Sequence, residues 1–409
     1  MSDFITVDDA LAELLARIPD TAVERIHLGL GAERRLAESV EAPWNSPRFD
    51  NSAMDGFALR WADLKSVPTT LEITGISAAG SPSSEVVTEG QAFRISTGAA
   101  VPSGADTVVP RELCDADTLE VTVKQRPKRG EGANIRRTGT YLKAGEAALS
   151  PGTRLGGAEI GLLASFGKPV VAVHARPRVA IISTGDELVE LGEEPTSGQI
   201  VNSNAYMLEA LVEANGGIPQ VFPIVADRRK DTVATFVRAI ASCDMVLSSG
   251  GVSVGDHDHV RSVVDELTGG MTFWKVKMKP GKPLAFGVAH LDTHAVPIIG
   301  LPGNPASSFV GFHLFVRPAL EVAQGASPTD APLPRIEASL AGPVRGSRGR
   351  RAYLAGRAIP TGHGITFEPR RNQSSGNPAL FADANALGIV EEGREMLKEG
   401  AQIPIHLLQ

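Results

Sequence analysis

Residues 177–325 constrain the fold most, because short apolar segments alternate there with longer segments of helical composition. The apolar runs typical of buried strands are residues 179–183, 221–225, 245–247, 284–288 and 295–299. Residues 203–214 and 231–241 have the length of helices. Such alternation is typical of a doubly wound, mostly parallel sheet that helices cover on both faces. We therefore expect an α/β domain over residues 177–325, with its ligand beyond the carboxyl ends of the strands.

Polar residues or glycine clusters follow these apolar runs directly. They are residues 183–187, Asp227, residues 248–258 and residues 300–308. A single glycine-rich turn indicates only a tight connection, but four such turns at one sheet edge favour a binding site. The turn formed by Ser248, Ser249, Gly250 and Gly251 lets backbone amides approach an anion closely. It matches neither a Walker A sequence nor a G-x-G-x-x-G fingerprint.

The carboxylates that belong to this edge of the sheet are Asp186, Glu187, Asp227, Asp256 and Asp258. They are hard oxygen ligands with no cysteine nearby, which favours Mg²⁺ bridging to a phosphorylated substrate over zinc or iron. Asp256 has a second interpretation that is equally good, as the N-cap of the helix that follows it.

A group of lysines comes next in the sequence, namely Lys275, Lys277, Lys279 and Lys282 around the turn 279–283. If residues 275–279 form a strand, its three lysines line one face, because they alternate with Val276 and Met278. A basic face beside glycine turns and carboxylates indicates an oxyanion substrate. The alternative is a solvated edge strand that carries lysines against aggregation.

The chain on either side of the α/β domain is organised differently. Thr6 and Asp9 resemble a capping box, and an amphipathic helix follows them until Pro19. Residues 43–144 alternate short β-rich runs with glycine, proline and serine clusters, which predicts a β-rich domain. Residues 158–166 are an apolar helical run that we expect to pack on the first helix. The β-rich domain would then be an insertion between two halves of a helical domain.

The last segment, residues 326–409, has short strands and turns typical of a small β-barrel or sandwich. Its arginines and hydroxyls, among them Arg350 and Ser375, suit contacts to an anion, and a solvated surface is the equal alternative. The β-rich domain has its own polar clusters, which include Asp55 and Thr97. On physical grounds alone these clusters are turns and nothing more.

Composition and charge exclude several classes of protein. Forty Lys and Arg against 47 Asp and Glu give a net charge of −7, which leaves no general basic surface for nucleic acid. Cys114 and Cys243 are far apart in the sequence, which argues against a disulfide framework and a cysteine-rich metal site. The first nine residues are acidic, and no stretch approaches about 18 apolar residues. We therefore expect a cytoplasmic protein that does not bind membranes.

Taken together, the motifs resemble the MoeA-type molybdopterin molybdenumtransferases, a family related to the E domain of gephyrin. The matching motifs span essentially the whole chain in order: residues 50–56, 97–99, 183–188, 248–255, 279–283 and 300–305. The resemblance implies a multidomain α/β plus β protein. Its domains would be a helical linker domain (1–42 and 145–176), an inserted β-rich domain (43–144), a doubly wound α/β domain of molybdopterin-binding type (177–325) and a C-terminal small β-barrel (326–409). It also implies a homodimer, in which the insertion of one subunit reaches over the α/β cleft of the other.

The reaction that the resemblance implies is the Mg²⁺-dependent insertion of molybdate into adenylylated molybdopterin, with release of AMP, the last step of molybdenum cofactor biosynthesis. By this likeness Glu187, Asp227 and Asp258 would hold Mg²⁺ or position the pyrophosphate for cleavage. Asp55 and Thr97 would act from the partner's insertion. The substrate contacts would come from Thr184, Gly185, Asp186, Ser248, Ser249, Gly250, Gly251, Ser253, Lys275, Lys279, Lys282, Pro302, Pro305, Arg350 and Ser375.

The sequence departs from the family pattern at one place. Many relatives carry an aromatic residue, any residue and then arginine in the last domain, whereas here Tyr353 and Leu354 precede Ala355, and Arg357 comes two places later. Two other functions stay open, a gephyrin-like scaffold that binds a protein and the adenylylation of molybdopterin. The domains that flank residues 177–325 argue against the second. Besides the pterin substrate and a second copy of the chain, molybdopterin adenylyltransferase or another protein is a candidate partner.

Overall fold

The computed structural model describes residues 4–252, 259–292 and 294–408, and the chain falls into two compact units. The larger unit comprises Met1–Glu38, Pro151–Gly161 and Pro169–Gln409, and the smaller comprises Ser39–Ser150 and Leu162–Lys168. Within the described ranges, no helix is long and apolar enough to cross a membrane. The larger unit is therefore assembled from three separate stretches of the chain.

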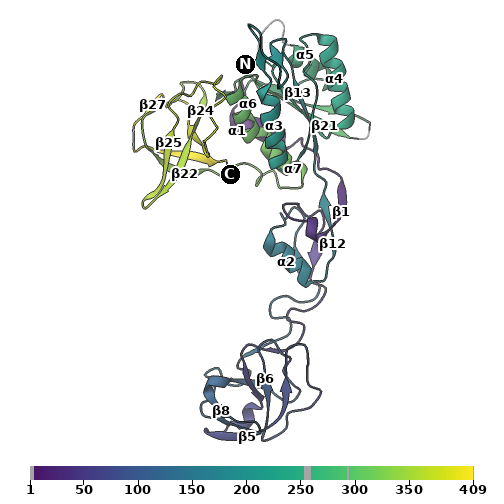
Figure 1. The fold of residues 1–409 in the computed structure, drawn as a ribbon, viewed down its shortest axis with the longest axis vertical. Helices are drawn as coiled ribbons and strands as arrows, with labels where there is room; N and C mark the ends of the chain where they lie inside the picture. The colour runs from purple at the N-terminus through teal and green to yellow at the C-terminus, as the bar shows by residue number, and fades with distance from the viewer. Residues whose placement is uncertain (1–3, 253–258, 293, 409) are drawn as a thin grey trace. The chain divides into compact units, whose positions relative to one another are not determined.

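A six-stranded sheet forms the centre of the α/β part of the larger unit (Figure 1). Its strands in spatial order are β16 (Ile218–Val221), β13 (Arg178–Ser183), β17 (Met245–Ser249), β21 (Ala295–Leu301), β20 (Ala285–His290) and β18 (Phe273–Trp274). The first four are parallel, β20 is antiparallel to β21, and β18 is antiparallel to β20. Only four residues connect β20 to β21, too few for the crossover that parallel neighbours need. The predicted mostly parallel sheet is confirmed, with antiparallel strands at one edge.

Helical segments cover both faces of this sheet. They are α3 (Ser203–Ala214), α4 (Arg229–Ser242), α5 (His259–Leu267), α6 (Pro305–Gly311), the π-helical segment η4 (Phe312–Val316) and α7 (Arg317–Ala323). Ile181 shares a hydrophobic core with Leu208 of α3, while the adjacent Ile182 shares the opposite core with Phe236 of α4. Because successive strand side chains point to opposite faces, a strand covered on both sides must be apolar throughout.

One predicted strand has a different position in the structure. The apolar run 221–225 predicts a strand there, but β16 ends at Val221. Pro223 has no backbone N–H to donate to a ladder, so regular pairing stops before it. Beyond the proline, Val225 N donates to Ser183 O at 2.9 Å, which keeps the chain beside the sheet until Asp227.

The lysine segment is also not the single strand that the sequence predicts. Phe273–Trp274 belongs to the α/β sheet as β18, whereas β19 (Met278–Lys279) pairs in parallel with a strand of the C-terminal region. Between them Lys275 has a φ of 154°, which interrupts the strand. Val276 and Met278 are buried while the lysines are more exposed, so the alternation holds without a continuous strand.

The first helix, α1 (Val7–Leu15), begins where the capping residues predict. Asp9 N donates to Thr6 Oγ1 at 3.1 Å, and the Thr6 hydroxyl donates to Asp9 Oδ2 at 2.6 Å. The prediction that this helix packs on residues 158–166 is wrong. Its buried face, which includes Leu14, joins the core formed by α3, η4 and α7 instead. The apolar pattern gave the buried face of the helix correctly but not its partner.

The C-terminal region is a closed five-stranded barrel, as the sequence predicts. Its strands in order are β24 (Arg351–Thr361), β25 (Gly364–Pro369), β22 (Ile336–Leu340), β28 (Gln402–Leu407) and β26 (Ala386–Val390), and β26 pairs with β24 to close it. Phe367 fills the interior. A Cβ atom on Gly356 or Gly388 would lie 2.3 or 2.5 Å from its ring, so both positions require glycine.

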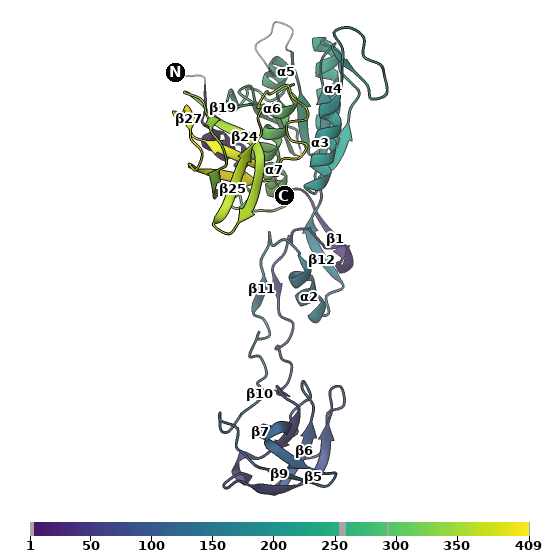
Figure 2. The same ribbon diagram turned by 60° about the vertical axis from the view of Figure 1, so that its left-hand side comes forward.

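The smaller unit contains a second six-stranded sheet (Figure 2). Its strands in order are β7 (Thr107–Pro110), β4 (Gly56–Leu59), β6 (Gln91–Ile95), β5 (Thr69–Ser77), β9 (Glu120–Val123) and β8 (Cys114–Ala116). Phe57 and Leu59 belong to one buried cluster and Ala58 and Phe93 to another, so the sheet is covered on both faces. This is the β-rich structure that the turn spacing predicts.

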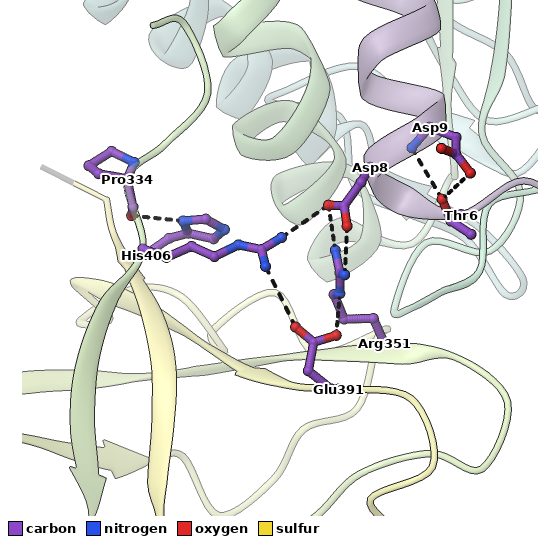
Figure 3. Close-up of polar contacts among 8 residues, drawn as sticks. Thr6, Asp8, Asp9, Pro334, Arg351, Glu391 and His406 are labelled. Carbon is purple, nitrogen blue, oxygen red and sulfur yellow. Dashed lines mark hydrogen bonds and ion pairs between the residues drawn. The ribbon is translucent and has the colours of Figure 1, made fainter. Parts of the chain in front are cut away.

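An ion-pair network joins the first helix to the C-terminal barrel (Figure 3). Asp8 accepts hydrogen bonds from Arg351 at 2.7 and 2.8 Å and from Arg335 at 3.0 Å. Arg351 also donates to Glu391 at 2.7 Å. The hydrogen bond from Arg351 is the main reason that the pKa of Asp8 is lowered. Because Asp8 is on α1, the network fixes the start of the chain against the barrel.

Replacing Asp8 by Asn should therefore destabilise the protein in a pH-dependent way. A carboxylate whose pKa is lowered on folding stabilises the protein above its unfolded pKa, and this stabilisation disappears as the pH falls through the folded pKa. We expect Asp8→Asn to cost no more than about 1 kcal/mol at pH 7, because the side chain is 60% exposed. The difference from wild type in urea midpoint should shrink as the pH falls below about 4.

The control is Asp20→Asn, since Asp20 is exposed and forms no ion pair in the part of the chain that the structure describes. An equal, pH-independent loss in both variants would contradict the role given to the Asp8 network.

Candidate functional site

Three loops meet at the carboxyl edge of the α/β sheet. Thr184 N donates to Ser249 O at 3.3 Å, and Gly185 N donates to Val225 O at 3.2 Å. Asp227 N donates to Asp186 Oδ1 at 3.0 Å. The structure thus brings together the residues that follow β13, β16 and β17, which the sequence places at one edge.

Glycine is required where these loops touch. Gly250 has a φ of 94°, and a Cβ atom there would lie 2.7 Å from Thr184 O. Gly251 has a φ of 68°, and its Cβ would lie 2.3 Å from Val260 Cγ2. Any residue other than glycine would suffer both backbone strain and a steric clash at these positions. The turn therefore presents bare backbone to the edge of the sheet.

Buried hydroxyls at this edge lack a protein partner. Thr184 Oγ1 and Ser248 Oγ are buried and form no hydrogen bond within the described ranges. The Ser249 hydroxyl is held by Asn204 Nδ2 at 2.7 Å, and the same amide donates to Gly303 O at 2.7 Å. Ser183 Oγ, at the end of β13, is a third buried hydroxyl of this kind. Buried polar groups are nearly always satisfied, so such hydroxyls are available to a ligand or water. Sequence reasoning missed Asn204, which lies within a polar run, residues 202–204, between two apolar segments.

The carboxylates of the edge differ in exposure. Asp186 and Glu187 are exposed, and Asp227 is half-buried. Among the residues that the structure describes, no group of three His, Cys, Asp or Glu side chains could hold a metal ion. Two of the predicted site residues, Asp258 and Ser253, lie outside the described residues, so the three-carboxylate set predicted from the sequence is only partly visible.

The loop after β21 lies next to the glycine turn. A Cβ atom on Gly303 would lie 3.5 Å from Gly250 Cα. Pro302 is buried, and its carbonyl accepts a hydrogen bond from the Ser308 hydroxyl. Pro305 occupies the first turn of α6, as the sequence predicts. Within the larger unit this loop links the glycine edge to a second feature, a cavity beside the barrel.

That cavity has a volume of about 1280 Å³ and is lined by cations. Its charged residues are Lys279, Lys282, Arg345, Arg350, Arg370, Arg371 and Glu368. Arg370 is paired with Asp383 at 2.8 Å, which leaves five cations for one carboxylate in the lining. We call this cavity the basic pocket. Four of the predicted site residues, Lys279, Lys282, Arg350 and Ser375, lie in it together.

Hydroxyl and amide groups complete the wall of the basic pocket. Ser307, Ser374, Ser375 and Asn304 line it. Ala306 N donates to Ser375 O at 3.1 Å, which ties the start of α6 to the barrel loop. Guanidinium, ammonium and hydroxyl donors around a cavity of this size suit an oxyanion or a phosphorylated substrate.

Lys275 does not line the basic pocket, unlike the other two lysines predicted for the site. Its ammonium lies 4.0 Å from the centre of the Trp274 ring and 5.8 Å from that of Phe4. The Lys282 ammonium lies 4.9 Å from the same Phe4 ring. Phe4 therefore holds two lysines by cation–π contact, a role that nothing in the sequence pattern indicates.

Not all the arginines of the C-terminal region line the basic pocket. Arg348 pairs with Glu395, and Arg351 belongs to the Asp8 network, so neither faces the basic pocket. At the departure from the family pattern, Ala355 is buried and its N–H donates to Gln373 Oε1 at 3.0 Å. Gln373 thereby anchors the loop that carries Arg370 and Arg371 against β24.

Asp55 and Thr97 lie together in the smaller unit. Asp55 Oδ1 accepts from Thr97 N at 2.6 Å and from its hydroxyl at 3.0 Å. These hydrogen bonds lower the pKa of Asp55, so the carboxylate is ionised at neutral pH.

The chain matches three family models that together cover most of its length. Residues 5–167 match the MoeA N-terminal region (domain I and II), residues 180–322 a probable molybdopterin binding domain, and residues 337–408 the MoeA C-terminal region (domain IV).

Full-length relatives agree with these matches. A molybdopterin molybdenumtransferase of Nostoc sp. is 38% identical over 386 residues, which cover 93% of this chain and 87% of that protein. One of Haemophilus influenzae is 34% identical over 411 residues, covering 99% of this chain and 100% of that protein. The crystal structure of a molybdopterin biosynthesis MoeA protein from Pyrococcus horikoshii is 28% identical, with a TM-score of 0.84 and coverage of 99% and 100%.

The tight turn at Gly250 makes a prediction about stability. Gly198 has a similar φ of 88°, but no heavy atom lies within 4 Å of the place that a Cβ would take, so Gly198→Ala should cost only about 1 kcal/mol for the strained backbone. Gly250→Ala adds the clash with Thr184 and should cost about 1–3 kcal/mol more. Urea unfolding of the two variants measures the difference, and equal losses would show that the turn relaxes without cost.

Proposed function

The chain belongs to the MoeA family, and from that membership we propose that it is a molybdopterin molybdenumtransferase that inserts molybdate into adenylylated molybdopterin and releases AMP. Relatives that match nearly the whole chain carry this enzyme's name. The observation that best supports the proposal is the basic pocket beside a glycine-rich strand edge. Such a pair of features offers one place for an inorganic oxyanion and another for a phosphorylated organic molecule.

Molybdate is a tetrahedral dianion, and the basic pocket suits it. Lys279, Lys282 and Arg350 supply positive charge, and Ser375 adds a hydroxyl donor. Charge-assisted hydrogen bonds of this kind are stronger than neutral ones and hold an oxyanion in a fixed orientation. We assign these four residues to molybdate binding.

The adenylylated pterin would bind along the glycine edge. Its phosphates need close backbone amides, and Gly250 and Gly251 have no side chains that block their approach. The unpartnered hydroxyls of Thr184 and Ser248 are donors that a phosphate oxygen would satisfy. Asn204 supports the site by holding Ser249 and Gly303 in place.

Magnesium is the third component of the proposal. Glu187, Asp227 and Asp258 would hold Mg²⁺, and the oxygen donors described at this edge are of the type that this ion prefers. Bound Mg²⁺ would neutralise phosphate charge and polarise the phosphoanhydride that is cleaved to release AMP. The contact between Asp186 and Asp227 supports this assignment, because it keeps the loops that carry two of the carboxylates together.

The same family membership leads us to propose a homodimer. In it, the ionised Asp55 and its donor Thr97 would complete the site of the other subunit. Their mutual hydrogen bonds give Asp55 one orientation in the smaller unit, as a residue that contacts substrate needs.

Glu187→Gln should reduce AMP release about a hundredfold or more, because it removes a charged oxygen ligand from Mg²⁺. The assay follows molybdate-dependent release of AMP from adenylylated molybdopterin by the purified protein. Glu194→Gln is the matched control, since Glu194 is an exposed carboxylate in the next loop, after β14 (Leu188–Val189). The proposed function fails if wild type releases no more AMP than Glu187→Gln.

Arg350→Gln should raise the KM for molybdate about tenfold, with little change in the KM for adenylylated molybdopterin. The reason is that Arg350 lines the basic pocket, whose lining includes none of residues Ser248 to Gly251. Arg348→Gln serves as the control, because Arg348 is 85% exposed and does not line the pocket. A rise in both KM values, or the same effect in both variants, would contradict the assignment of molybdate to the basic pocket.

A further inference from the structure

A second cavity lies at the opposite edge of the α/β sheet from the candidate site. It has a volume of about 610 Å³. Arg176, which lines it, comes just before β13, and Asn215 and Gly216 come just before β16, so it adjoins the amino ends of the strands. All of its lining residues belong to the larger unit. No residue assigned above to the proposed function lines it.

Arginines dominate the charges of this second cavity. Its charged residues are Arg35, Arg154, Arg176, Arg317, Glu33, Glu213 and Glu321. The structure pairs Arg35 with Glu321, through Nη2 at 2.5 Å and Nε at 3.1 Å, and Arg154 with Glu33.

The two remaining arginines, Arg176 and Arg317, form no ion pair within the described ranges, and one exposed carboxylate, Glu213, is left to balance them. Arg317 is only partly exposed to solvent, and burial lowers its pKa. The nearby carboxylate of Glu321 offsets this only in part, since Glu321 is hydrogen-bonded to Arg35. A partly buried cation that no carboxylate contacts directly is stabilised when an anion binds.

His313 provides an independent sign of a ligand. It lies on the π-helical segment η4 and lines the second cavity, yet its side chain is 3% exposed. Neither ring nitrogen has a hydrogen-bond partner among the described residues. A buried polar group of this kind is rare in native proteins and needs an explanation.

The surroundings of His313 determine what it can offer. Burial lowers its pKa to about 3, so the ring is neutral at pH 7 and has one N–H to donate. A neutral ring does not repel Arg317, which is four residues further along the chain on the same helical face. Phe309, 4.5 Å away between ring centres, and Leu211 add apolar surface to the cavity.

The backbone carbonyls near the cavity do not oppose an anion strongly. Asn215 is the C-cap of α3, where exposed carbonyls would repel negative charge. Gln324 Nε2 donates to Asn215 O at 3.2 Å, so this carbonyl of a lining residue is already satisfied by an amide. The balance of charges in the wall therefore stays positive.

We propose that the second cavity binds a small organic molecule that carries a phosphate group, through the guanidinium groups of Arg176 and Arg317 and the ring N–H of His313. Arginine matches phosphate oxygens with its fixed fork of donors. The volume lies within the usual range for small-molecule sites, and the apolar wall offers space for the organic part of such a molecule.

Calorimetric titration of the full-length protein with inorganic phosphate and with phenyl phosphate, at constant ionic strength, tests the proposal. Both probes should bind to a Lys279→Gln variant, in which the basic pocket is weakened, and phenyl phosphate should bind more tightly because it also contacts the apolar wall. In that background, Arg317→Gln and Arg176→Gln should each weaken binding about tenfold or more. His313→Phe keeps the aromatic ring and should weaken binding as well.

The matched control is Arg238→Gln in the same background, because Arg238 is an exposed arginine of α4 that lines neither cavity. Arg176 is exposed, so its substitution tests the site even if Arg317→Gln unfolds the protein. Each probe should also raise the thermal midpoint of the Lys279→Gln protein, and raise that of the His313→Phe variant made in it by less.

The proposal is overturned if neither probe binds to Lys279→Gln, which would leave only water in the cavity. It is also overturned if Arg176→Gln and His313→Phe change the affinity no more than Arg238→Gln. If inorganic phosphate and phenyl phosphate bind with equal affinity, the site recognises only a free oxyanion, and the proposal of an organic ligand is overturned. None of these outcomes depends on AMP release, so the proposed function stands or falls separately.

Discussion

Close backbone approach at the carboxyl edge of the α/β sheet is the constraint on which the candidate site depends. Gly250 and Gly251 let the loop after β17 touch Thr184, and Gly303 brings the loop after β21 against the same turn. One amide, that of Asn204, then joins the two loops by two hydrogen bonds. Larger side chains at Gly250 or Gly251 would separate the strand ends and, with them, the residues that follow. The polar groups at the edge can therefore hold their positions only because Gly250 and Gly251 have no side chains.

Pairing of charges explains how an acidic chain forms two basic cavities. Many arginines of the larger unit are neutralised locally: Arg348 by Glu395, Arg351 by Asp8 and Glu391, Arg370 by Asp383, Arg35 by Glu321. The arginines without such partners, among them Arg350 and Arg317, line the cavities. Net charge averages over both groups, so the value of −7 says little about any one site. What matters at a site is which cations the fold leaves without a carboxylate.

Local sequence patterns predicted the helices, the strands and the sheet edge. They did not predict which segments, far apart in the sequence, contact one another. The apolar run at β13 and the proline at the start of α6 carry their own signals, and the structure follows both. The amphipathic face of α1 gave no indication of its partner, because several apolar surfaces could cover it equally well. The lysine segment was misjudged since its two ends belong to different sheets. The second cavity had no signal at all: Arg35, Arg176 and Arg317 are spread across the chain, and only the fold brings them together.

The Asp8 network has a consequence for the order in which the protein can form during synthesis. Asp8 cannot meet Arg351 until the ribosome has added 343 further residues, and Glu391, which directly follows β26, comes later still. The apolar face of the first helix packs on η4 and α7, so it too stays uncovered until the residues up to Ala323 have been added. The smaller unit, by contrast, comes almost entirely from one continuous stretch, Ser39–Ser150, and its sheet can be complete long before. The part of the protein synthesised first is thus among the last to reach its native contacts.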